Sequence, residues 1–151
     1  MRRVPSASPR AQGDLPDVNV WLALLNQQHP HHDAAKDYWE RAAAPRIGFC
    51  RITMLGMLRL STNKSVMSGI PYTAEQAWQA YQQLIDLPEV VFITEPSGIE
   101  PAMRALTSTG RFRSADWTDA YLAALARLAG LRMVSFDKGF AQYGGLTLLS
   151  P

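Results

Sequence analysis

The residues in this chain whose types and spacing could do chemistry are three aspartates in its C-terminal third. Asp116 and Asp119 lie three residues apart, which places them on nearly the same face of a helix. Asp137 follows an apolar run, residues 131–136, that is typical of a short buried strand. Carboxylates held 4 Å apart repel one another by about 4 kcal/mol per pair at an effective dielectric near 20. Because no histidine or cysteine lies nearby in the sequence, the group favours a hard ion such as Mg²⁺ or Mn²⁺.

The same three residues also have an interpretation without chemistry. Asp116 and Asp119 would then be ordinary first-turn acids, which the positive end of a helix dipole favours. Asp137 would open a turn with Lys138 and Gly139. Spacing alone leaves both interpretations open.

A helix and a strand predicted within residues 115–137 would position these acids. Apolar residues recur there at helical spacing up to a stop at Gly130, and Ser114 is the predicted N-cap. A helix of about 15 residues rises roughly 22 Å and a six-residue strand spans roughly 20 Å, so the strand returns to the start of the helix. Asp119 and Asp137 are therefore expected at one end, which in a parallel sheet is the carboxyl edge where ligands bind.

A fourth acid, Asp17, lies where a first strand would pass into the helical stretch from Trp21 to Leu25. If a strand ends at Asp17, this carboxylate joins the same edge of the sheet. Pro16 lacks an N–H group, which weakens a central strand, so either the strand is very short or the natural start of the chain differs. Residues 1–14 are polar, rich in Pro and Arg, and without periodicity. They are expected to be a disordered extension of a single domain formed by residues 15–151.

The composition excludes several classes of protein. A length of 151 residues suits one domain, and a net charge of +2 with 47% hydrophobic residues excludes wholesale disorder. Any nucleic-acid contact must therefore be local. The lone Cys50 excludes an internal disulfide framework. No apolar run approaches the length of a membrane span, and no hydrophobic signal core follows the basic N-terminus, so a cytoplasmic location without membrane contact is expected.

Strands and helices alternate along the rest of the chain, without an internal repeat. Strands are predicted over residues 46–50, 89–93 and 146–149, and helices over residues 33–43, 53–60, 73–86 and 99–107. Thr73 and Gln76 form a capping box at the start of one of these helices, and the apolar and aromatic positions of this helix, Trp78 among them, are expected in the core. The alternation predicts an α/β fold of three layers, in which helices flank a central, mostly parallel sheet.

Two polar segments have alternative interpretations. His29, His31 and His32 invite a zinc site, but no cysteine accompanies them, and a loop that enters the next helix is favoured. Arg111 and Arg113 flank Phe112 in a loop just before the acidic helix. This loop is either solvated or a phosphate clamp beside the metal site.

Several segments together resemble a known family. They are Asp17-Val18-Asn19-Val20, residues 119–126 (DAYLAALA) and Ser135-Phe136-Asp137-Lys138-Gly139-Phe140, with Cys50-Arg51-Ile52-Thr53 and residues 56–63 between them. In order and spacing they resemble the PIN-domain ribonucleases, and most of all the VapC toxins of VapBC toxin–antitoxin pairs. The likeness covers about residues 15–151, so a PIN-like fold is expected.

The resemblance implies an endoribonuclease that depends on Mg²⁺ or Mn²⁺, cleaves RNA to leave a 5′-phosphate and a 3′-hydroxyl, forms a homodimer and is inhibited by a VapB-like antitoxin. It assigns catalysis and metal binding to Asp17, Asp119 and Asp137, with Asp116 as an extra metal ligand. Asn19 and Ser135 would support these acids. Arg59, Arg111 and Arg113 would bind RNA.

The chain departs from the family pattern at Met54. The family commonly has an acid, usually Glu, directly after the threonine that corresponds to Thr53. A thioether cannot replace a carboxylate as a ligand of Mg²⁺, so weakened activity is expected. The alternative is a degenerate PIN domain that binds RNA or an antitoxin without catalysis. A phosphatase or receiver-like role ranks lower, because the accompanying Lys and Thr signals are missing.

Overall fold

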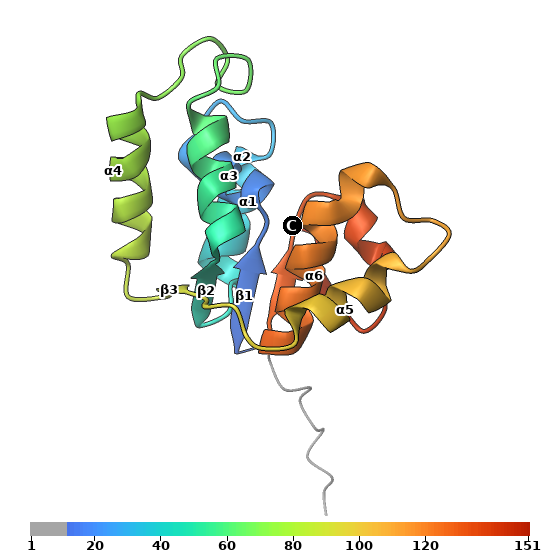
Figure 1. The fold of residues 1–151 in the computed structure, drawn as a ribbon. Coiled ribbons are helices and arrows are strands. Elements are labelled where there is room, and N and C mark those ends of the chain that lie inside the picture. Colours follow the sequence, from blue (N-terminus) through green and yellow to red (C-terminus); the bar gives the residue numbers. More distant parts are fainter. Residues whose placement is uncertain (1–11) are drawn as a thin grey trace, which may run out of the picture.

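Five short strands form one parallel sheet at the centre of the protein (Figure 1). The structure is a computed structural model that describes residues 12–151. The strand order is β3-β2-β1-β4-β5, so the first strand of the chain lies in the middle of the sheet. The bounds are β1 Gly13–Pro16, β2 Arg46–Phe49, β3 Val90–Phe92, β4 Arg132–Val134 and β5 Leu148–Leu149. The predicted α/β class with a parallel sheet is confirmed.

Helices connect the strands and cover the sheet on both faces. Their bounds are α1 Val18–Leu25, α2 His32–Asp37, α3 Arg51–Ser61, α4 Ala74–Ile85, α5 Ile99–Thr107 and α6 Trp117–Ala129. Three short turns of other helix types complete the list: a π-helical turn η1 Tyr38–Ala42 and 3₁₀ turns η2 Ser114–Asp116 and η3 Lys138–Gln142. Among residues 12–151, no helix has the length and apolar character needed to cross a membrane.

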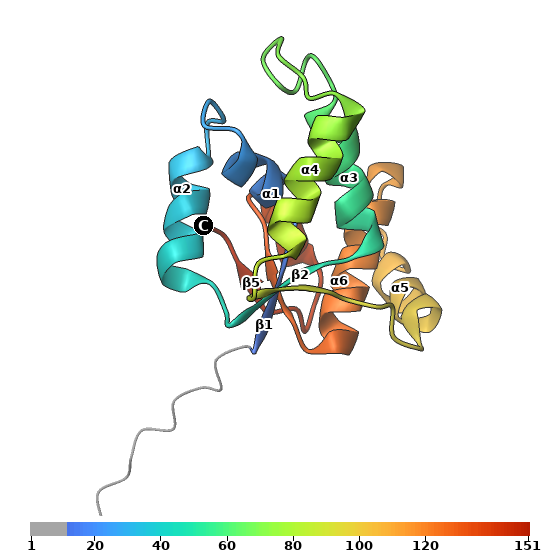
Figure 2. The same ribbon diagram turned by 90° about the vertical axis from the view of Figure 1, so that its left-hand side faces the viewer.

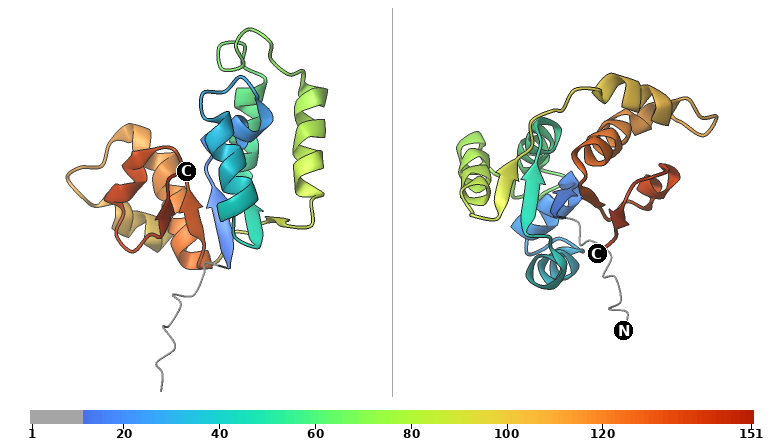
Figure 3. Two further views of the ribbon diagram at one scale, coloured as in Figure 1. Left: turned by 180° about the vertical axis from the view of Figure 1, so that it is seen from behind. Right: turned by 90° about the horizontal axis from the view of Figure 1, so that it is seen from below.

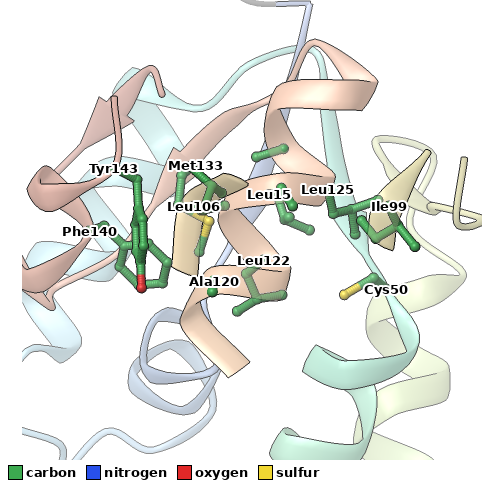
Figure 4. Packing of buried hydrophobic residues seen from close by; sticks show 13 residues of the cluster. Leu15, Cys50, Ile99, Leu106, Ala120, Leu122, Leu125, Met133, Phe140 and Tyr143 are labelled. Atoms are coloured by element: carbon green, nitrogen blue, oxygen red, sulfur yellow. The ribbon is translucent and has the colours of Figure 1, made fainter. Parts of the chain in front are cut away.

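The layers follow from the alternation of side chains along the strands. Leu15 of β1 and Met133 of β4 point to one face, where they join a core cluster with α5 and α6 (Figure 4). Ile47 and Phe49 of β2 belong to a cluster on the opposite face with residues of α1, α3 and α4. Val134 packs on that face against Tyr38. Figure 3 shows α5 and α6 on one side of the strands and α2 on the other. The expected three layers are therefore confirmed.

Helices α3 and α4 form a hairpin that projects beyond the strands (Figures 1 and 2). The predicted capping box at the start of α4 is present, because Gln76 N donates to Thr73 Oγ1 at 3.1 Å and Thr73 N donates to Gln76 Oε1 at 2.9 Å. Trp78 on α4 is 51% exposed, so its expected place in the core is wrong. The helical periodicity groups Trp78 with Tyr81 and Leu84, and so predicts that all three are buried. However, no element of the described chain packs over Trp78.

The N-terminal boundary also differs from the expected one. β1 begins at Gly13, and Asp14 is fully buried, so the prediction that the fold starts at residue 15 is wrong for these two residues. The reason is a partner far along the chain: Arg132 donates to both carboxylate oxygens of Asp14, at 2.8 and 2.9 Å, and Tyr38 Oη donates to Oδ2 at 2.7 Å. The rest of the predicted extension, residues 1–11, lies outside the described residues.

Helix α6 ends as predicted but begins later. Gly130 has φ +67°, the left-handed conformation that commonly ends a helix. Ser114 is not the N-cap, because it opens the 3₁₀ turn η2 and α6 starts at Trp117. The carboxylate of Asp116 stabilises this turn, since Arg113 N donates to its Oδ2 at 3.1 Å. Asp116 is the residue that precedes α6, but its side chain makes no capping bond to that helix.

Candidate active site

Asp17 lies at the carboxyl end of β1, where it is the N-cap of α1. Its Oδ1 accepts a hydrogen bond from Val18 N at 2.8 Å, and its Oδ2 accepts one from Ser135 Oγ at 2.8 Å. Burial raises the pKa of the Asp17 carboxyl and the charge of Asp137 raises it further, while the bonds from Ser135 and Val18 oppose the shift. The predicted strand end therefore holds a partly buried carboxylate in a fixed orientation.

Ser135, directly after β4, joins the ends of the two central strands. Its side chain is fully buried. The hydroxyl donates to Asp17, and it accepts hydrogen bonds from Asp137 N at 2.9 Å and from Asn19 Nδ2 at 3.3 Å. Asn19 Oδ1 in turn accepts from Phe136 N at 3.4 Å. The two residues expected to support the acids thus lie between Asp17 and Asp137.

Asp119 lies in the first turn of α6 and is half-buried. Its pKa is raised to about 6, first by burial and then by the negative charges of Asp17, Asp137 and Asp116. The structure therefore brings the other three predicted acids within electrostatic range of Asp119. They come from three separate segments, at the ends of β1 and β4 and at the start of α6.

Asp116 and Asp137 differ from each other in their surroundings. Asp116 is buried, and besides its bond from Arg113 N it forms an ion pair with the Arg113 guanidinium, Nη2 to Oδ1, at 3.4 Å. Asp137 is exposed, and its Oδ1 accepts from Gly139 N at 2.8 Å, which closes the predicted turn. Asp137 therefore has free oxygen lone pairs facing solvent, whereas Asp116 already has one cation beside it.

The donor chemistry of this group fits a hard divalent ion, because it offers carboxylate oxygens and no nitrogen or sulfur ligand. Nevertheless, across residues 12–151 no three acidic, histidine or cysteine side chains converge tightly enough to form a preformed metal site. Burial and the negative charges of Asp17, Asp137 and Asp116 disfavour the charged form of Asp119. A divalent cation would remove the repulsion and draw the oxygens together.

Comparison with known proteins identifies the family. The PIN domain family matches residues 15–146 of the chain. The chain belongs to the PIN-domain family. The ribonuclease VapC41 of Mycobacterium tuberculosis is 40% identical over 137 residues, which cover 87% of this chain and 94% of that protein. This PIN domain is therefore an endoribonuclease of the VapC group, the toxin component of a VapBC pair, and the resemblance found in the sequence is confirmed.

Solved structures of this family share the fold at much lower sequence identity. The sarcin-ricin loop cleaving toxin VapC20 of M. tuberculosis superposes with a TM-score of 0.66 at 19% identity, covering 91% of this chain and 98% of that chain. VapBC2 from Rickettsia felis, bound to a DNA fragment from its promoter, gives a TM-score of 0.64 at 12% identity with the same coverage. The PIN-like architecture expected from the sequence is thus confirmed.

Met54, where an acid is common in such PIN domains, belongs to the core. It is 5% exposed and packs with Trp21 and Phe49 on the α1 side of the sheet. Arg51 Nη1 lies 3.2 Å from its sulfur, and the Arg51 guanidinium lies 4.7 Å from the centre of the Phe92 ring. The Met54 side chain therefore lies in an apolar environment with one cation, the Arg51 guanidinium, in contact with it.

The three histidines of this PIN domain lie at the loop before α2, and the three arginines predicted to bind RNA lie on the surface. His32 Nδ1 lies 2.7 Å from Ala23 O, His29 Nδ1 accepts from His31 N at 3.0 Å, and His31 stacks on Phe136. These contacts shape the loop before α2, as the favoured interpretation expected. The three predicted RNA-binding residues, Arg59, Arg111 and Arg113, are all exposed.

Tyr143, for which the sequence predicts no role, also lies within electrostatic range of the aspartates. It follows Asp137 by six residues at the end of η3, and in the sequence it looks like any aromatic residue of a C-terminal loop. Nothing in the local pattern distinguishes it. Only the packing of η3 against α6 brings it to the site.

Proposed function

We propose that Asp17, Asp116, Asp119 and Asp137 hold a divalent ion, Mg²⁺ or Mn²⁺, and that this PIN domain hydrolyses RNA at that position. One observation supports the proposal above the others: burial, together with the negative charges of Asp17, Asp137 and Asp116, raises the pKa of Asp119 to about 6. A protein that folds at the cost of such repulsion gains stability when a cation binds there.

The ion and the residues of the site would have different roles in hydrolysis. A bound divalent ion lowers the pKa of water and offsets negative charge on a phosphate. Ser135 holds Asp17 in one orientation, and each Asp17 oxygen keeps a lone pair beyond its present hydrogen bond. Asp119 must lose its proton before it can ligate, so metal affinity should fall below about pH 6. Hydrolysis would add water across the P–O bond and leave a 5′-phosphate and a 3′-hydroxyl.

Calorimetric titration of Mn²⁺ into the purified protein, together with a cleavage assay on single-stranded RNA, tests the proposal. We expect binding at neutral pH, cleavage with Mg²⁺ or Mn²⁺, and loss of cleavage in EDTA. RNA binding without metal binding or cleavage would contradict the proposal and favour the alternative, a degenerate PIN domain that acts as a binding module.

Met54→Glu should strengthen the metal site. The variant adds a carboxylate on the first turns of α3, and Arg51, now beside the sulfur, reduces the cost of burying its charge. We expect Mn²⁺ affinity to rise about threefold to tenfold, because ligand charge sets the affinity of such sites, and RNA cleavage to rise with it. Met54→Gln is the matched control, since it has the same length but no charge. If Glu and Gln give the same affinity, position 54 does not face the metal.

We also propose that Arg59, Arg111 and Arg113 contact the RNA backbone. Arg111 and Arg113 precede the acidic turn η2, beside Trp117, which is 54% exposed and packs against Phe112 with ring centres 4.7 Å apart. An exposed aromatic ring flanked by cations is typical of single-strand binding surfaces. Arg111→Gln should weaken RNA binding and reduce the slope of log affinity against log salt by about 0.7. Arg104→Gln on α5 is the control, and an unchanged slope for Arg111→Gln would contradict the contact.

For partners, we propose a homodimer and a VapB-like antitoxin in the cytoplasm, where the RNA substrate is found. Large apolar side chains remain exposed on the α3–α4 hairpin and its loop: Leu55, Val66, Ile70 and Trp78. A basic side chain from the antitoxin would pair with the aspartates and displace the metal. Light scattering that shows only monomer at high micromolar concentration would contradict the dimer.

A further inference from the structure

The hydroxyl of Tyr143 is buried without a hydrogen-bond partner among the described residues. The whole residue is only 5% exposed, and its ring packs edge-on against Phe140, with ring centres 6.2 Å apart, in the core cluster that contains Ala120 and Ala123 of α6. Leaving a buried hydroxyl unpaired destabilises the folded protein. Such a group in a well-packed core therefore points to a partner that binds from outside the chain.

The surroundings of this hydroxyl indicate which partner fits. Figure 4 shows Tyr143 beside Phe140, with its oxygen pointing along α6 toward the end that carries Ala120, which is the end where Asp116 and Asp119 lie. Burial and the charges of Asp116, Asp119 and Asp137 raise the pKa of Tyr143 to about 12. The phenol therefore keeps its proton at neutral pH and acts as a donor. None of the three carboxylates is within hydrogen-bond distance of it.

We propose that Tyr143 is a positioning residue whose hydroxyl donates a hydrogen bond to an oxygen ligand, water or a phosphate oxygen, of the divalent ion held by the aspartates. The inference rests on the proposed metal site. It explains why a neutral donor lies near carboxylates that it does not touch: the missing partner carries a lone pair. Outer contacts of this kind orient the ligands of a metal ion and tune its affinity.

Tyr143→Phe tests the inference, because the substitution removes one oxygen and keeps the ring. In EDTA the variant should melt at the same temperature as the wild type or about 2 °C or more above it, since it loses an unpaired buried group. In calorimetry its Kd for Mn²⁺ should rise about threefold to tenfold. At saturating Mn²⁺, kcat on single-stranded RNA should fall by about tenfold while KM changes little, as expected for a group that acts after substrate binding. The opposite signs of the stability and metal effects separate this role from a structural one.

Tyr121→Phe is the matched control. It removes a hydroxyl from α6 that already has a partner, because Tyr121 Oη donates to Glu95 at 2.9 Å. Its Mn²⁺ affinity should equal that of the wild type. A melting temperature of Tyr143→Phe clearly below that of the wild type in EDTA would overturn the inference, since the hydroxyl would then be paired within the chain.

Equal Mn²⁺ affinities for the wild type and Tyr143→Phe, with binding lost in Asp119→Asn, would overturn the inference and leave the proposed metal site standing. If the wild type itself binds no Mn²⁺, both the inference and the metal site are wrong. The same loss of affinity in Tyr121→Phe would also overturn the inference, because the effect would not be specific to the orphan hydroxyl.

Discussion

Asp119→Asn should abolish metal-dependent RNA cleavage, by a factor of about 10² to 10³ or more, and at the same time stabilise the metal-free protein. The loss of activity follows from removing one anionic ligand from a site that has few. The gain in stability follows from the burial and the charge repulsion that together raise the pKa of Asp119 to about 6 in the folded protein, against an ordinary value of 3.8. A neutral amide of the same shape is free of that repulsion.

The sign of the pH dependence follows from this shift. Between about pH 4 and pH 6 the folded state holds a proton at Asp119 that the unfolded state has lost, so the wild type loses stability as the pH rises through this range. The Asp119→Asn variant has no such proton and avoids this loss. In EDTA at pH 7.5 the variant should therefore be more stable than the wild type, by about 1 kcal/mol after allowance for solvent screening of a half-exposed group. At pH 4 the two should melt together.

Thermal melts at pH 4, 5, 6 and 7.5 in EDTA, paired with cleavage assays in Mn²⁺, measure both effects. Asp37→Asn is the control for removing a charge, because among residues 12–151 Asp37 forms an ion pair only with Arg41, on the surface of α2 and η1. It should change neither quantity appreciably. An Asp119→Asn variant that still cleaves RNA, or that melts below the wild type at pH 7.5, would contradict the proposed role of Asp119.

Asp14→Asn should have the opposite effect on stability. Asp14 is fully buried, and the Arg132 guanidinium binds both of its oxygens while Ala44 N and Tyr38 Oη donate to Oδ2. Removing the negative charge leaves Arg132 without its counter-ion next to the core. Breaking such a pair costs about 3–5 kcal/mol, so we expect a loss of about 3 kcal/mol because the Arg132 side chain is still 21% exposed.

Urea denaturation at constant pH measures this loss, and Asp37→Asn again serves as the surface control. Below the unfolding transition, the Asp14→Asn protein should still bind Mn²⁺ with wild-type stoichiometry, because Asp14 lies at the opposite end of β1 from Asp17. A loss of under 1 kcal/mol would show that Arg132 finds other partners, such as Ala42 O, to which it already donates at 2.7 Å.

The parts of the fold that the sequence predicts well are those set by local signals. Helix α5 spans the predicted residues, α4 starts at its capping box, and Gly130 ends α6, because each depends on residues within one or two turns. The burial of Asp14 could not be predicted in this way. Its counter-ion lies 118 residues away, and an aspartate so close to a proline looks like part of a polar leader.

In the candidate site, too, the features set by local sequence are predictable and those set by long-range packing are not. The lengths of α6 and β4 predict that Asp119 and Asp137 lie at one end of the molecule, and the structure places them within electrostatic range. The link through Ser135 to Asp17 depends on two strands from opposite ends of the chain pairing side by side. The orphan hydroxyl of Tyr143 depends on how η3 packs against α6. Sequence patterns record neither of these long-range arrangements.

The central position of β1 in the sheet also determines the stage of synthesis at which the candidate site can form. Asp17 is made early, but its partner Ser135 follows 118 residues later, and chains are synthesised at about 5–20 residues per second. On the ribosome, β4 therefore emerges roughly 6–24 s after β1. Of the two strands that pair with β1, β2 is synthesised first, so β1 can pair with β2 before β4 is available. During translation Asp17 is not aligned with Asp137 until β4 has formed beside β1. The arrangement of Asp17, Ser135 and Asp137 is therefore complete only after the final strands have left the ribosome.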